Sequence, residues 1–135
     1  MPDYEISDDP SRLDLDAIHA FLSTEAYWSP GVTRSTVERS IDGSLAFGVY
    51  VAGSGEQVGF ARVVTDRATF AWIADVYVLS EHRGNGLGKR LVETILGHGE
   101  LQGLRRWFLA TADAHGLYRQ FGFTPLVGPE RFMAL

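Results

Sequence analysis

Apolar residues recur at helical spacing near the start of the chain. In residues 11–23, "SRLDLDAIHAFLS", four of them fall on one helical face: Leu15, Ile18, Phe21 and Leu22. The pattern predicts a helix with Ser11 as its N-cap. Residues 27–31, "YWSPG", then interrupt the periodicity with proline and glycine. A serine and a glutamate at capping-box spacing open residues 35–41, which are predicted to form a short second helix.

The pattern then changes to the β-rich composition typical of strands. Three such runs, residues 44–52, 57–65 and 69–79, are separated by short turns. They are predicted to form an antiparallel meander. Residues 4–7 alternate weakly and are expected to add a short strand.

The second half of the chain alternates helices and strands. Residues 86–98 form an amphipathic helical pattern, residues 106–111 a buried strand, and residues 113–122 a short helix stopped by glycine. One or two further strands are expected in residues 123–135. The strand 69–79, the helix that follows it and the next strand make a right-handed βαβ crossover. This order predicts an α+β fold with a mixed α/β sheet.

Length and composition describe one ordinary folded domain. The chain has 135 residues, 45% of them hydrophobic, so a single domain over residues 1–135 is expected. It has no cysteine, and its four histidines show no metal-ligand spacing, so neither disulfides nor a metal site are expected. No apolar run approaches the roughly 18 residues of a membrane span, and the polar, acidic N-terminus is not a signal sequence. We therefore expect a cytoplasmic protein that does not bind membranes.

One loop carries a cluster of basic residues, although the chain as a whole is acidic. The net charge of −5 argues against nucleic-acid binding, which requires clustered cations. A basic cluster nevertheless stands in residues 79–98, "LSEHRGNGLGKRLVETILGH", where three glycines fall within five positions: Gly84, Gly86 and Gly88. Amides at a helix start lack internal partners, the helix dipole favours anions there, and glycines allow a close approach. The loop therefore predicts a cradle for a pyrophosphate.

Three glycine patterns bind phosphates at the start of a helix. A Walker A loop would need serine or threonine where Arg90 stands, and a dinucleotide fingerprint would need glycine where Lys89 stands. The third pattern, arginine or glutamine followed at fixed spacing by two glycines, is matched by Arg83, Gly86 and Gly88.

Two segments of the sequence resemble the GNAT superfamily of acetyl-CoA-dependent N-acetyltransferases. "VYVLSEHRGNGLGKRLVE" (76–93) is similar to that family's strand, pyrophosphate loop and helix, and "ATADAHGLYRQFGFTPL" (110–126) to its later tyrosine segment. The order and lengths of the elements match over essentially the whole chain. Ser80 stands where relatives usually have proline, and Asp113 where many have asparagine. The resemblance implies a mostly antiparallel mixed sheet of about six or seven strands, splayed at residues 69–79 and flanked by about four helices.

The resemblance also implies a cofactor site for acetyl-CoA, which serves as co-substrate. Main-chain amides of seven consecutive residues would hold the pyrophosphate: Arg83, Gly84, Asn85, Gly86, Leu87, Gly88 and Lys89. The backbone of Val76, Tyr77 and Val78 would pair with the pantetheine arm as an added strand pairs with a sheet edge, and the Val78 amide would polarise the thioester carbonyl. Tyr118 resembles the family's general acid for the CoA thiolate. The alternative is a helix tyrosine that packs its ring in the core.

The sequence indicates fewer residues for binding the amine acceptor than for binding the cofactor. Asp75 lies in a largely apolar strand, so it must find a partner or water. It is predicted either to orient the amine or accept its proton through water, or to bond a neighbouring backbone at the sheet edge. Tyr27 and Trp28 are large aromatics that are costly to expose, and the resemblance implies that the region between the first two helices roofs the acceptor pocket, so they are predicted to line it. Core packing is the alternative. Phe47 and Trp72 are expected mainly to pack in the core.

Two classes of function follow from the resemblance. The first is an enzyme that acetylates a primary amine of a small molecule, or alternatively of a protein or peptide. The second is a non-catalytic acyl-CoA-binding module, which the presence of Tyr118 disfavours. The sequence leaves the acceptor, the acyl chain, the general base and the formation of a homodimer open.

Overall fold

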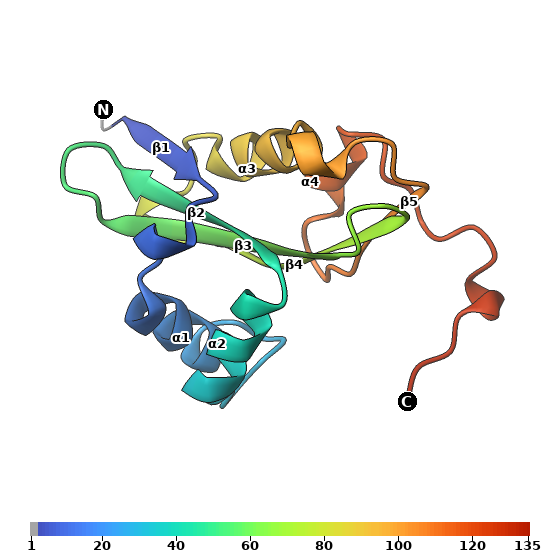
Figure 1. Cartoon of the computed structure of the whole chain (residues 1–135), viewed down its shortest axis with the longest axis horizontal. Coiled ribbons are helices and arrows are strands. Elements are labelled where there is room, and N and C mark those ends of the chain that lie inside the picture. The colour runs from blue at the N-terminus through green and yellow to red at the C-terminus, as the bar shows by residue number, and fades with distance from the viewer. Residues whose placement is uncertain (1–2) are drawn as a thin grey trace.

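The protein is built on one open sheet whose strands follow chain order. In the computed structural model, which describes residues 3–135, five strands are arranged β1-β2-β3-β4-β5 (Figure 1). Their bounds are β1 (Tyr4–Ser7), β2 (Leu45–Val51), β3 (Gln57–Thr65), β4 (Phe70–Val78) and β5 (Arg106–Leu109). Strands β1 to β4 pair antiparallel, and β5 pairs parallel to β4. The predicted meander and the parallel crossover are therefore confirmed.

Two helices cover each face of this sheet (Figure 1). The first pair is α1 (Leu15–Thr24) and α2 (Arg34–Asp42), and the second is α3 (Leu87–Leu96) and α4 (His115–Arg119). Short 3-10 turns lie at Pro10–Arg12, Ser80–His82, Gly99–Leu101 and Pro129–Arg131. The mixed α+β class and the four predicted helices are confirmed.

The N-cap of the first helix differs from the prediction. Ser11 lies in a separate 3-10 turn, and the carboxylate of Asp14 caps α1 by accepting from the Ala17 amide at 3.0 Å. The reason is local: Leu13, which follows the turn, has an extended backbone, so the helix can begin only after it.

The strands predicted in residues 123–135 are wrong. This segment forms no strand; Phe123 packs against Tyr118, and the end of the segment runs away from the body of the molecule (Figure 1), so the sheet has five strands rather than six or seven. Pro125 and Pro129 lack the amide that a ladder requires, and Gly128 turns the chain with φ 68°. The apolar Leu126 and Val127 consequently stay exposed.

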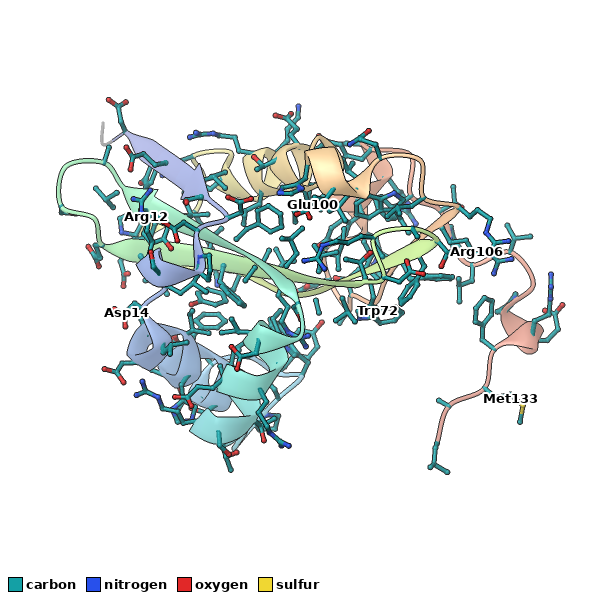
Figure 2. All side chains as sticks on the ribbon, in the orientation of Figure 1. Arg12, Asp14, Trp72, Glu100, Arg106 and Met133 are labelled. Carbon is teal, nitrogen blue, oxygen red and sulfur yellow. The ribbon has the colours of Figure 1, made fainter. Side chains whose placement is uncertain are left out.

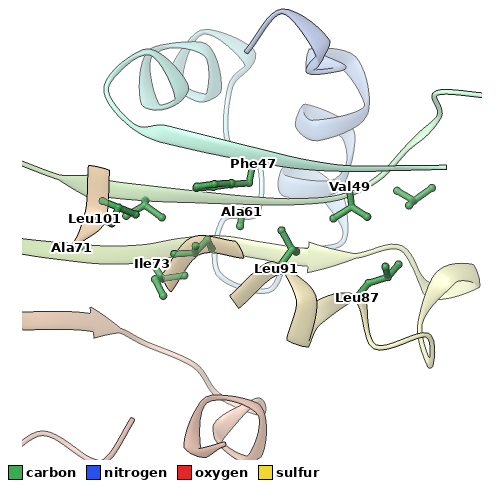
Figure 3. Close-up of a cluster of buried hydrophobic side chains, with 11 residues drawn as sticks. Phe47, Val49, Ala61, Ala71, Ile73, Leu87, Leu91 and Leu101 are labelled. Atoms are coloured by element: carbon green, nitrogen blue, oxygen red, sulfur yellow. The ribbon is translucent and has the colours of Figure 1, made fainter. Parts of the chain in front are cut away.

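Each face of the sheet carries its own hydrophobic layer. Figure 3 shows the layer under α3, where Phe47, Val49 and Ile73 of the strands meet Leu87 and Leu91 of the helix. A second layer packs the opposite sheet face against α1 and α2. Each large apolar side chain buried in this way contributes about 1.5–3 kcal/mol. Phe47 is fully buried, as predicted.

A β-bulge in the middle of β4 changes which face of the sheet its side chains point to. Phe60 pairs with Tyr77 and Arg62 with Ala74, which leaves two residues of β4, Asp75 and Val76, opposite one residue of β3. Asp75 adopts φ 55°, a left-handed conformation that few non-glycine residues take. The bulge therefore turns the end of β4 and places Asp75 at an irregular point of the sheet.

The sheet opens beside this bulge. Strand β5 pairs only with the first part of β4, from Phe70 with Arg106 to Ile73 with Leu109. The edge of β4 from Ala74 to Val78 therefore has no β5 partner. This confirms the splay predicted at residues 69–79 and leaves room for a ligand at the carboxyl end of β4.

Candidate active site

A cavity of about 910 Å³ occupies the opening between β4 and β5. Its walls come from the α1–α2 loop, from β3 and β4, from the glycine loop before α3, and from the segment that carries α4. All the predicted site residues except Asn85 line it. Residues far apart in the sequence thus converge at one place.

The glycine loop at one end of the cavity is shaped for an anion. Gly84 and Gly86 have φ 83° and 72°, and a Cβ added to either would meet no atom within 4 Å. Glycine is therefore required by the backbone conformation, and the space beside it is open. The first helical bond of α3 runs from Arg90 to the Gly86 carbonyl at 3.0 Å. Among residues 3–135, no acceptor lies within hydrogen-bond distance of the amides of residues 84–89.

Two side chains brace this loop, and one amide is already used. The Arg83 amide donates to the Ser80 carbonyl at 3.3 Å, so six free amides remain rather than the predicted seven. The Arg83 side chain donates through Nε to the Val78 carbonyl at 2.9 Å. Asn85 donates through Nδ2 to the His82 carbonyl at 3.0 Å, which explains why its side chain is absent from the cavity wall.

The main chain of Val78 faces the opening. In a strand, the N–H and C=O of one residue point to the same edge. The Val78 carbonyl receives Arg83 rather than a group of β3, while the next amide, that of Leu79, donates back to Val58 of β3 at 2.8 Å. The Val78 N–H is therefore directed toward the open edge of β4. Its position fits the predicted contact with a thioester oxygen.

The side chain of Tyr77 has a structural role. Its ring stacks on Phe21 with centroids 3.9 Å apart, in the layer under α1 and α2. Burial raises the pKa of the Tyr77 hydroxyl above its usual range. Its main chain pairs with Phe60 of β3, so its N–H and C=O point to β3 rather than to the open edge.

Tyr118 combines a packed ring with an unpartnered hydroxyl. The residue is 6% exposed, and its ring meets Phe123 edge to face at 5.9 Å. Gly122, with φ 92°, ends the α4 turn and brings Phe123 back onto that ring, which accounts for the spacing of the tyrosine and "GF". Within residues 3–135, the hydroxyl has no hydrogen-bond partner. Burial raises the pKa of Tyr118, so it keeps its proton near neutral pH.

Asp75 belongs to a side-chain network rather than to a backbone contact. One carboxylate oxygen accepts from Arg62 Nε at 2.7 Å, and the other from Trp28 Nε1 at 2.9 Å. Arg62 also donates to Ser44 Oγ at 3.1 Å. The side chains of Arg62 and Asp75 are 19% and 12% exposed, so the ion pair is largely shielded from water. Arg62 was missed by sequence reasoning, although an arginine within an apolar strand must find a partner.

Tyr27 and Trp28 line the cavity and bridge the opening. Trp28 is tied to β4 through Asp75, while the Tyr27 hydroxyl accepts from the Ala112 amide beyond β5 at 2.9 Å. Their rings meet edge to face at 5.0 Å, and both remain substantially exposed to the cavity. Trp72 corrects the prediction of core packing: it is 40% exposed and lines the cavity from the sheet (Figure 2). Its neighbours in β4 face α3, so alternation turns Trp72 outward.

Comparison with known proteins agrees with this geometry. The family model for the acetyltransferase (GNAT) domain matches residues 46–125. The chain belongs to the GNAT acetyltransferase family. A protein of Gibberella zeae that is provisionally named an acetyltransferase is 35% identical over 136 aligned positions, which cover 86% of this chain and 76% of that protein.

Solved structures show the same architecture. A GNAT-family protein of Xanthomonas campestris pv. campestris is 49% identical, with a TM-score of 0.95 over 100% of this chain and 94% of its own. Glucosamine-6-phosphate N-acetyltransferase of Arabidopsis thaliana is 19% identical, with a TM-score of 0.67 over 93% of this chain and 94% of its own. At that identity the second likeness concerns the fold.

No helix in residues 3–135 is long and apolar enough to cross a membrane. No group of three or more histidine, aspartate or glutamate side chains there could hold a metal ion.

Proposed function

We propose that this protein transfers the acetyl group of acetyl-CoA to a primary amine of a small molecule in the cytoplasm. The observation that carries the proposal is one cavity that joins the free amides of the glycine loop to the unpartnered hydroxyl of Tyr118. An anion-binding loop at one end and a proton donor at the other are what acyl transfer from a thioester of coenzyme A requires.

The loop fits the diphosphate of coenzyme A. Gly84 and Gly86 leave open space where side chains would otherwise stand, and the amides of residues 84–89 lack acceptors. Arg83 and Lys89 add positive charge at the same end of the cavity. The open edge of β4, from Val76 to Val78, would pair with the pantetheine arm.

Two groups of the chain would then act on the reaction. The neutral amine attacks the thioester carbonyl, whose oxygen accepts a hydrogen bond from the Val78 N–H as negative charge develops. The carbon–sulfur bond breaks, and Tyr118 gives its hydroxyl proton to the departing sulfur. The proton lost by the amine leaves through water and restores Tyr118.

Asp75 is proposed to position the acceptor site. Both of its oxygens already accept from cationic or indole donors, and through them it fixes Arg62 and Trp28 in the cavity wall. A carboxylate held in this way orders the surface on which the amine would rest. This assigns to Asp75 the orienting role rather than that of a base.

Release of free thiol tests the proposal. With acetyl-CoA and a panel of primary amines, we expect thiol release that depends on the amine, together with the acetylated amine by mass spectrometry. Isothermal titration with coenzyme A is expected to show binding in the same preparation. Binding without amine-dependent thiol release would contradict the transferase function and would favour a non-catalytic acyl-CoA-binding module.

A further inference from the structure

The cavity is divided by charge. At the glycine loop, Arg83 and Lys89 supply positive charge. The remaining walls carry three carboxylates, Glu25, Asp75 and Asp113, against one guanidinium, that of Arg62, which leaves a net charge of −2. One end of the cavity therefore favours an anion, and the other favours a cation.

The excess negative charge lies on two residues. Asp75 is neutralised by Arg62 at 2.7 Å, and Arg62 is itself occupied by Asp75 and Ser44. Glu25 and Asp113 form no ion pair or side-chain hydrogen bond with any of residues 3–135. Both are exposed at the cavity rim, so their charges are available to a ligand.

Aromatic faces surround the same end. Tyr27, Trp28 and Trp72 are 59%, 41% and 40% exposed, and all three line the cavity. Exposed indole and phenol rings attract ammonium groups through their quadrupoles. A second observation points to a ligand here: Tyr118 is 6% exposed as a residue and lines the cavity, and its hydroxyl has no hydrogen-bond partner among residues 3–135.

The attacking nitrogen cannot satisfy these carboxylates, because it must lose its charge to react. A cation that persists through the reaction must stand elsewhere on the acceptor. We infer that the acceptor is an aliphatic amine with a second amino group that stays protonated while the first reacts, held by Glu25, Asp113 and the exposed aromatic rings. This inference rests on the proposed function and narrows it to diamines and related amines.

Three probes of similar length test the inference: putrescine with a distal ammonium, butylamine with a methyl, and γ-aminobutyrate with a carboxylate. From thiol release at saturating acetyl-CoA, we expect kcat/KM for putrescine to exceed that for butylamine by about tenfold or more. A tenfold difference corresponds to about 1.4 kcal/mol. We expect γ-aminobutyrate to be the poorest. The preference for putrescine should shrink as salt screens the exposed carboxylates.

Substitutions of the two carboxylates test whether they cause the preference for putrescine. Glu25→Gln and Asp113→Asn should each reduce the putrescine-to-butylamine ratio about threefold or more. Glu56→Gln is the matched control, because Glu56 is an exposed carboxylate that neither lines the cavity nor forms an ion pair with residues 3–135, and the ratio should persist.

The outcomes separate this inference from the proposed function. Equal use of putrescine and butylamine, or a preference for γ-aminobutyrate, would overturn the inference while leaving a working transferase. A putrescine preference that survives both cavity variants would overturn the assignment to Glu25 and Asp113. If no amine releases thiol although coenzyme A binds, the transferase function fails, and the inference fails with it.

Discussion

Tyr118 is a buried residue that lines the cavity, and its hydroxyl has no hydrogen-bond partner among residues 3–135, so a ligand can use it. Tyr118→Phe keeps the ring that packs on Phe123 and removes only the oxygen. Because a positioned general acid typically contributes about 10²–10⁴-fold, we expect kcat to fall by about 100-fold. The dissociation constant of acetyl-CoA, from isothermal titration, should change less than about threefold, since neighbouring contacts persist. An unaltered kcat would remove Tyr118 as the acid.

The proton of this tyrosine also fixes the alkaline limit of activity. Burial raises the pKa of Tyr118, so the protonated acid persists beyond the pH at which an exposed tyrosine ionises. On the alkaline side of a profile of kcat against pH, we expect no decline until about pH 10, and a decline above it. A decline centred near neutral pH would mean that another group supplies the proton.

The ion pair of Asp75 and Arg62 contributes to the stability of the fold and to the position of the side chains in the cavity wall. Asparagine tolerates the left-handed φ of 55° at residue 75, so Asp75→Asn removes charge without adding backbone strain. Because the pair is largely shielded, we expect a loss of about 2 kcal/mol in the free energy of unfolding by urea, between the values for exposed and buried pairs.

The same variant tests the positioning role. The KM of the amine should rise because Trp28 and Arg62 lose their common partner. If kcat of the wild type declines toward acid pH, that decline should persist in Asp75→Asn. Its loss in the variant would instead identify Asp75 as the base.

Among the elements, the start of α3 is the most directly testable. Gly86 is its N-cap with φ 72°, a conformation that costs a residue with a Cβ about 1–2 kcal/mol. Gly86→Ala should therefore destabilise the protein by about that amount and also weaken coenzyme A binding, because the methyl enters the open space beside the amides.

Gly103→Ala provides the matched control. Gly103 has φ 75° and open surroundings but lies outside the cavity. The free energy of unfolding of Gly103→Ala, from urea denaturation, should fall by a similar amount without a change in coenzyme A affinity. If both variants bind coenzyme A as the wild type does, the loop is not the diphosphate site.

Most elements could be predicted because their signals are local. Helical periodicity identified residues 11–23, and alternation with turns identified the three central strands. The N-cap at Asp14 was missed because Ser11 and Asp14 carry equally good capping side chains, and only the extended backbone at Leu13 decides between them. The C-terminal strands failed because a composition suited to strands does not provide a neighbour with which to pair.

For the molecule as a whole, the predictable part of the site is the part that is contiguous in sequence. The glycine loop and the spacing of Tyr118 to "GF" each lie within one short segment, so their chemistry could be predicted. Arg62 meets Asp75 only because a bulge shifts the register of β4, and Trp28 reaches Asp75 from the loop between α1 and α2, 47 positions away in the sequence. Such contacts depend on backbone irregularities that residue patterns do not encode.

A crystal structure of the protein with coenzyme A tests the proposed site most directly. We predict that the diphosphate accepts hydrogen bonds from the amides of residues 84–89, that the pantetheine arm lies along Val76 to Val78, and that the thiol stands beside the Tyr118 hydroxyl. A diphosphate bound elsewhere, or a thiol remote from Tyr118 while the glycine loop stays empty, would contradict the proposal.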